Sequence, residues 1–110
     1  MVLYNVEVTS EARQEIRELA GNMRQRVLGL LKALQEEPRP HNSKRMDTAS
    51  LPGELPISVE LYRIRVESWR IIYALEEELQ LVTVLVIRKR PPYQYDDLGQ
   101  LVDGVMDTEE

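Results

Sequence analysis

The side chains best suited to chemistry in this sequence are basic and lie in the segment from residue 61 to residue 95. Arg63 and Arg65 stand two positions apart, so both point to the same face if the segment forms a β-strand. Cations gathered in this way repel one another, and a bound polyanion would relieve that repulsion. Arginine also forms bidentate hydrogen bonds with phosphate. The candidates for this chemistry are Arg63, Arg65, Arg70, Arg88, Lys89, Arg90, Tyr93 and Tyr95.

Three segments with strand patterns carry these residues. Residues 62–67 and 69–75 follow a two-residue period, and residues 81–87 are almost entirely apolar. A two-residue period predicts a strand with one face on the core, whereas an apolar run rich in Val predicts a central strand buried on both faces. The connections at residues 67–68 and 76–80 are short. They predict an antiparallel, three-stranded meander.

The residues before the meander predict one more strand and two helices. Residues 2–8 alternate as a first strand, and Thr9 or Ser10 can cap the helix that follows. Apolar residues then recur at helical spacing, interrupted at Gly21 and Asn22, until about residue 37, which predicts an αα-hairpin on one face of the sheet. Gly29 inside the second helix costs about 1 kcal/mol relative to Ala, which a close helix approach would explain. The two apolar stripes are Ala12, Ile16, Leu19 and Ala20, then Met23, Val27, Leu28, Leu31 and Leu34.

Residues 38–56 contain four prolines and no clear period, which predicts a long loop of the kind that often has a function. Lys44 and Arg45 lie in it, and we expect the loop to form a flap at the edge of the sheet face that carries Arg63 and Arg65. The only histidine, His41, is interpreted as a surface loop residue and not as a catalyst.

The charge distribution matters more here than the net charge of −5. Residues 38–95 carry nine cations and seven anions, whereas residues 96–110 carry six anions and no cation. We expect one domain over residues 1–102, with a short helix over residues 96–102, and a flexible acidic tail over residues 103–110.

Several classes of protein are disfavoured by composition. The chain has no cysteine, and no carboxylate–histidine cluster has ligand spacing, so neither a disulfide framework nor a metal site is expected. No segment reads as a signal peptide or a transmembrane helix, which predicts a cytoplasmic protein with no membrane partner.

The basic residues also have simpler interpretations, which the pattern alone leaves open. Arg63 and Arg65 could form the solvated face of an antiparallel strand, and the two tyrosines could be packing residues. Arg70 and Arg90 could pair with acids, namely Glu60, Glu67 or Asp47.

Taken together, five segments resemble the RelE/ParE superfamily of toxins from bacterial type II toxin–antitoxin systems. The resemblance covers residues 2–95 and implies a small α+β, RelE-like fold, with an antiparallel sheet in the order β-α-α-β-β-β, an αα-hairpin on one face and a short C-terminal helix or tail. The matching segments are YNVEVTSEARQEI, MRQRVLGLLKAL, NSKRM, LYRIRVESWRIIYAL and VTVLVIRKRPPY.

The resemblance implies two different activities. RelE-like members cleave messenger RNA on the ribosome without a metal or cofactor, whereas ParE-like members poison DNA gyrase and lack the cluster of cations and tyrosine. Because this chain keeps the cluster, we favour the nuclease over a gyrase poison or an inactive family member that serves as a binding module. The implied catalytic residues are Arg63, Arg65, Arg70, Arg90, Tyr93 and Tyr95, and the implied RNA-binding residues are Lys44, Arg45, Arg88 and Lys89.

The implied roles follow from side-chain chemistry. Arg70 and Arg90 would stabilise charge on the phosphoryl oxygens and are expected to be reachable by solvent on the sheet face away from the helices. The family commonly has Lys where this chain has Arg63 and Arg65, and since Arg does not lose its proton, a tyrosine (Tyr93 or Tyr95) is the better general base. The implied partners are a cognate antitoxin, the ribosome and mRNA, and the complex with the antitoxin would bind operator DNA through the antitoxin.

Overall fold

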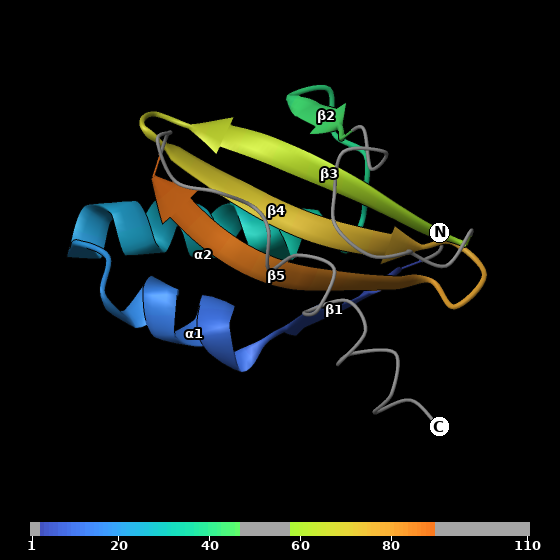
Figure 1. The fold of residues 1–110 in the computed structure, drawn as a ribbon, viewed down its shortest axis with the longest axis horizontal. Helices are drawn as coiled ribbons and strands as arrows, with labels where there is room; N and C mark the ends of the chain where they lie inside the picture. Colours follow the sequence, from blue (N-terminus) through green and yellow to red (C-terminus); the bar gives the residue numbers. More distant parts are fainter. Residues whose placement is uncertain (1–2, 47–57, 90–110) are drawn as a thin grey trace.

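The computed structural model describes residues 3–46 and 58–89, and these form two helices and a five-stranded sheet (Figure 1). Helix α2 passes behind β4 and β5 in the view shown. This confirms the predicted α+β fold with an αα-hairpin. The elements are β1 (Asn5–Val8), α1 (Ser10–Arg17), α2 (Gly21–Ala33), β2 (Ser43–Arg45), β3 (Val59–Val66), β4 (Trp69–Glu76) and β5 (Leu81–Lys89).

The strand order across the sheet is β1-β5-β4-β3-β2. The predicted antiparallel meander of β3, β4 and β5 is confirmed. The first strand differs from expectation because β1 lies parallel to β5, with Asn5 opposite Leu81 and Val8 opposite Val84. A tight turn forces antiparallel neighbours, but β1 and β5 are separated by both helices and three strands, so no such constraint acts on them.

Part of the predicted long loop is a strand. Residues 43–45 form β2, which pairs antiparallel with β3 at the edge of the sheet, and the Met46 N–H extends the pairing by donating to the Leu61 carbonyl at 2.8 Å. A strand of three residues is too short to display a period, so only its hydrogen bonds to β3 reveal it. Residues 47–57 lie outside the described part of the chain.

Local chemistry explains where the first helix starts. The Thr9 hydroxyl accepts a hydrogen bond from the Ala12 N–H at 3.1 Å, which confirms Thr9 as the N-cap, and it also donates to the Leu85 carbonyl at 2.7 Å. The Glu15 carboxylate accepts from the Ile87 N–H at 2.9 Å. Beyond the end of β1, α1 therefore satisfies backbone groups along the edge of β5 that would otherwise remain open for pairing.

The second helix departs from expectation at two positions. It ends at Ala33 and not near residue 37, and Leu28 lies on its exposed side. The expectation of a close approach at Gly29 is wrong, because a Cβ placed there meets no atom within 4 Å among the described residues outside the local helix backbone. Gly29 therefore lowers the helix propensity without a packing reason.

Apolar side chains are buried on both faces of the sheet. The larger cluster joins the helices to one face and includes Val27, Leu31, Tyr73 and Val84. A β-bulge between Ile72 and Tyr73 in the β4–β5 pairing sends two successive β5 residues to the opposite face. The predicted burial of β5 on both faces is thus confirmed. The cluster on the face away from the helices consists of Val59, Leu61, Ile72, Ala74, Leu85 and Val86.

Candidate phosphate-binding site

The sheet register aligns basic side chains of four strands on the face away from the helices. Lys44 on β2 is opposite Arg63 on β3, and Arg65 on β3 is opposite Arg70 on β4, which is itself opposite Arg88 on β5. Directly opposed residues of antiparallel strands point to the same face. Arg63 is also opposite Ile72, a member of the apolar cluster away from the helices. We call Lys44, Arg63, Arg65, Arg70 and Arg88 the basic face.

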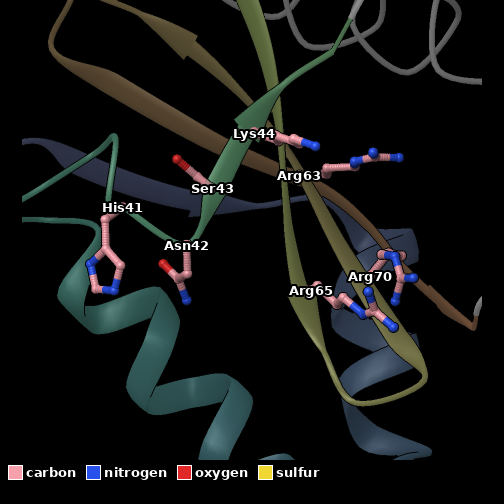
Figure 2. Close-up of a pocket in the computed structure, with 7 residues that line it drawn as sticks. All are labelled: His41, Asn42, Ser43, Lys44, Arg63, Arg65 and Arg70. Carbon is pink, nitrogen blue, oxygen red and sulfur yellow. The ribbon is translucent and has the colours of Figure 1, made fainter.

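An open pocket of about 350 Å³ lies at the β2 side of the basic face (Figure 2). Four of its lining side chains are cationic, and none of the lining side chains in the described part of the chain is a carboxylate. The local field is therefore strongly positive although the chain as a whole is acidic. The lining residues are His41, Asn42, Ser43, Lys44, Arg63, Arg65 and Arg70.

The two arginines of β3 are exposed, and no described carboxylate lies within 4 Å of either. Arg65 and Arg70 point the same way from neighbouring strands in Figure 2. Nothing in the described ranges neutralises these guanidinium groups, so they are available to an anionic ligand.

Arg70 differs from expectation, because it is only 9% exposed. It lies on β4 between its neighbours Arg65 and Arg88, and its Nη1 donates to the carbonyl oxygens of Trp69 at 3.0 Å and Glu67 at 3.4 Å. The prediction that solvent reaches it freely is wrong, since a central strand leaves little room around a side chain that folds back over its own turn. Arg70 still lines the pocket.

The carboxylates considered as partners for Arg70 are engaged elsewhere. Glu67 pairs with Arg26 at 3.3 Å and Glu60 with Arg39 at 3.2 Å. Asp47 lies outside the described residues.

The four predicted RNA-binding residues do not gather in one place. Lys44 lines the pocket, but Arg45 is opposite Tyr62 and therefore points to the helix face. Lys89 is opposite Trp69, and its Nζ lies 5.5 Å from the centre of the indole ring. Arg88 starts from the basic face, yet its Nε approaches the Glu15 carboxylate to 3.9 Å at the edge covered by α1.

Several predicted features fall outside the described residues. They are Arg90, Tyr93, Tyr95, the helix expected over residues 96–102 and the acidic tail expected over residues 103–110.

Sequence reasoning missed the wall of the pocket formed by residues 41–43. The Ser43 N–H donates to the Pro40 carbonyl at 2.9 Å, and its hydroxyl donates to the same oxygen at 2.6 Å. These bonds close a β-turn with His41 and Asn42 at its centre. The Pro-His-Asn-Ser sequence is a turn signal that was available, but its position beside β3 depends on the three-residue strand that no period revealed.

A second polar cluster is centred on Arg39, whose guanidinium group is ion-paired and hydrogen-bonded. Arg39 lies 3.2 Å from the Glu60 carboxylate and 2.8 Å from that of Glu77, and its Nε donates to the Tyr62 hydroxyl at 2.9 Å. Tyr62 donates to Glu60 at 2.6 Å, and this bond is the main reason that the pKa of Glu60 is lowered. Burial raises the pKa of Tyr73, which stacks on Tyr62, to about 12. Arg39, Glu60 and Glu77 are ion-paired here, whereas Arg63 and Arg65 of the pocket have no carboxylate within 4 Å in the described ranges.

Comparison with known proteins identifies the family. A family model described as the ParE toxin of the type II toxin–antitoxin system parDE matches residues 6–91, more than three quarters of the chain. The chain belongs to this toxin family, within the RelE/ParE superfamily. A search of curated protein sequences finds no significant match.

Solved structures similar to the toxin include several RelE structures. The archaeal RelE–RelB complex of Pyrococcus horikoshii matches with a TM-score of 0.69 at 20% identity, over 83% of this chain and 99% of that chain. A RelBE complex of Mycobacterium tuberculosis matches with a TM-score of 0.63 at 23% identity, over 81% and 100%. The intact RelBE complex of E. coli matches with a TM-score of 0.54 at 23% identity, over 80% and 98%. At these identities the likeness establishes the fold.

The side chains that line the toxin's pocket have the chemistry that suits a phosphodiester. Guanidinium and ammonium groups that are already positioned stabilise charge developing on phosphoryl oxygens.

Two other kinds of feature are absent from the described ranges. No group of three His, Asp or Glu residues there could hold a metal ion. Neither α1 nor α2 has the length and the hydropathy of a membrane-spanning helix.

Proposed function

We propose that this toxin is a ribosome-dependent endoribonuclease that cleaves mRNA and thereby inhibits translation in the cytoplasm. The observation that carries the proposal is the pocket in which Lys44, Arg63, Arg65 and Arg70 converge without a carboxylate among its described lining residues. Cations placed together at a cost in repulsion, with Arg63 and Arg65 exposed and without a described carboxylate within 4 Å, are suited to an anionic ligand.

The proposed reaction needs no metal or cofactor. The ribose 2′-oxygen loses its proton and attacks the adjacent phosphorus, the bond from phosphorus to the 5′-oxygen breaks, and that oxygen takes up a proton. The products are a 2′,3′-cyclic phosphate and a free 5′-hydroxyl. Arg63 and Arg65 would hold the phosphate, while Arg70 and Arg90 would stabilise the charge on its oxygens.

Proton removal has to come from another group. Arginine stays protonated at any physiological pH, so the arginines cannot act as the base. We assign this role to Tyr93 or Tyr95, whose hydroxyl pKa would fall beside several cations. The ribosome would orient the mRNA for the attack of the 2′-oxygen, which the pocket alone does not do.

Gyrase poisoning is the second candidate, and the match to the ParE toxin model favours it. A third is an inactive member that serves only as a binding module. Induced expression in a bacterium separates the three. The nuclease predicts new mRNA ends within reading frames by primer extension, the gyrase poison predicts double-strand breaks and an SOS response with intact mRNA, and the binding module predicts neither.

We also propose a cognate antitoxin as the partner that silences the toxin. All three of the similar structures named above are toxin–antitoxin complexes. An acidic segment that folds on binding would neutralise the basic face, and the complex would bind operator DNA through the antitoxin. Copurification with the product of an adjoining small reading frame tests the pairing.

A further inference from the structure

The pocket has two chemically different walls. The guanidinium groups of Arg63, Arg65 and Arg70 come from β3 and β4, whereas His41 and Asn42 come from the turn that leads into β2 (Figure 2). The first wall suits a phosphate. The second wall offers an imidazole and an amide, and neither His41 nor Asn42 is a guanidinium, an ammonium or a carboxylate.

The sheet register places the turn beside the phosphate wall. Ser43, where β2 begins, is opposite Ile64, the residue before Arg65 on β3, so the turn adjoins the part of β3 that carries Arg65. Asn42 immediately precedes the first residue of β2, and it lines the same pocket as Lys44 and Arg65. Figure 2 shows Asn42 and Arg65 at a similar height, one before β2 and the other on β3.

Both side chains of the turn are available to a ligand. His41 and Asn42 are exposed, and neither side chain has a hydrogen-bond partner within the described parts of the chain. The turn itself is held by the two bonds from Ser43 to the Pro40 carbonyl, so its side chains start from a fixed backbone. Because the backbone of the turn is already ordered, less conformational entropy is lost when a ligand binds.

The groups on this wall are those that recognise an unpaired nucleobase. An Asn amide offers a donor and an acceptor side by side, which matches the edge of a base, and an imidazole provides a flat face for stacking. A pocket of about 350 Å³ is at the small end of ligand sites, which range over about 300–1,000 Å³. Its volume is comparable to that of a single nucleotide.

We propose that the His41–Asn42 turn is a nucleobase subsite, which reads the unpaired base of the nucleotide whose phosphate is held by Arg63, Arg65 and Arg70. Asn42 reads the base edge and His41 stacks on the ring. This assignment of the substrate as single-stranded RNA read one base at a time rests on the proposed endoribonuclease function, but its binding step can be measured without cleavage.

The test uses the full chain, labelled with ¹⁵N, and two kinds of probe: inorganic phosphate and the four nucleoside 3′-monophosphates. Phosphate is expected to shift arginine side-chain signals only. The nucleotides are expected to shift the Asn42 amide and His41 ring signals as well, with Kd values that differ among the four bases. Since a good bidentate pair is worth on the order of a tenfold to hundredfold discrimination, Asn42→Ala should bring the four Kd values together.

Controls separate base reading from folding. Asn42→Gly removes the amide but keeps a residue that β-turns favour, so it should lose base discrimination and retain its Tm even if Asn42→Ala loses stability. Gln25→Ala, an exposed position on α2, should retain both discrimination and Tm. In every variant with an intact pocket, the affinity for inorganic phosphate should not change.

The outcomes distinguish the subsite from the reaction. Equal Kd values for the four nucleotides in the parent chain, or shifts confined to arginine signals, would overturn the subsite. Selective nucleotide binding combined with no mRNA cleavage on ribosomes would leave the subsite standing and overturn the endoribonuclease. Parent chain that binds neither phosphate nor nucleotides would overturn the subsite, whereas the endoribonuclease is judged by mRNA cleavage on ribosomes alone.

Discussion

Arg65 on β3 is the direct cross-strand neighbour of Arg70 on β4, so two guanidinium groups face the same side of the sheet from opposed positions. Like charges in this arrangement destabilise a sheet by about 0.2–1 kcal/mol relative to a neutral pair. The fold therefore gives up stability at the place where the proposed ligand binds.

Arg65→Gln tests whether Arg65 lowers stability while it supports activity. We expect the variant to gain about 0.2–1 kcal/mol in the free energy of unfolding, because the repulsion disappears, and to lose mRNA cleavage. Thermal melting and primer extension measure the two effects. Arg13→Gln removes the same charge from the exposed side of α1 and should change neither. A lower Tm for Arg65→Gln would mean that the arginine has a structural role.

Arg70→Ala should lose stability as well as activity. Its guanidinium donates to the Trp69 and Glu67 carbonyls, and Arg70 is 9% exposed. Truncation therefore removes buried hydrogen bonds worth about 1–3 kcal/mol, which exceeds the stability gained from the relief of repulsion.

Arg90→Ala is expected to lose toxicity with a Tm within a few degrees of the parent. Equal melting of Arg70→Ala and Arg90→Ala would contradict the structural part of the Arg70 prediction.

The alignment of the arginines was predictable because local signals fix it. The two-residue turn at Glu67 and Ser68 sets Val66 opposite Trp69, and counting back one pair along the alternating strands puts Arg65 opposite Arg70. The α+β fold and the meander follow from the same short turns and periods.

Other features depend on distant neighbours. The strand β2 exists because β3 has a free edge, and only that pairing decides that Lys44 joins the basic face while Arg45 does not. The burial of Arg70 depends on flanking strands, and the His41–Asn42 turn joins the site because β2 carries it there. Local sequence patterns do not predict any of these three relationships.

Gly29→Ala should stabilise the toxin. The position is exposed within α2 and a Cβ there meets no atom within 4 Å, so the substitution gains about 1 kcal/mol of helix propensity without a clash. A rise in Tm at unchanged mRNA cleavage is the expected result. A fall would show that something contacts this side of the helix.

Acid should weaken the cluster around Arg39. The pKa of Glu60 is lowered chiefly by the Tyr62 hydroxyl, and that of Glu77 chiefly by the Tyr4 hydroxyl, with Arg39 contributing to both. Because the folded-state pKa values lie below those of the unfolded chain, this stability is present above the unfolded value of about 4.3 and is lost as pH falls through the folded values.

Melting curves from pH 7 to pH 3 measure that loss. Tm should fall below about pH 4.5, and the fall attributable to this cluster should shrink in Glu60→Gln. Glu36→Gln serves as the control, since Glu36 has no ion pair within the described ranges. If both variants follow the parent curve, the cluster does not set the acid response.

Lys44 and Arg45 provide a matched test of which face binds RNA. They are exposed neighbours on β2, but Lys44 is opposite Arg63 on the basic face and Arg45 is opposite Tyr62 on the helix face. Each phosphate contact with a single strand contributes about −0.7 to the slope of log K against log salt. Lys44→Gln should therefore weaken binding of a short single-stranded RNA and make that slope shallower by about 0.7. Arg45→Gln removes an equal charge one residue away and should leave the slope unchanged. Equal changes in the two slopes would mean that phosphate contacts extend to the helix face, and no change in either would remove Lys44 from the binding site.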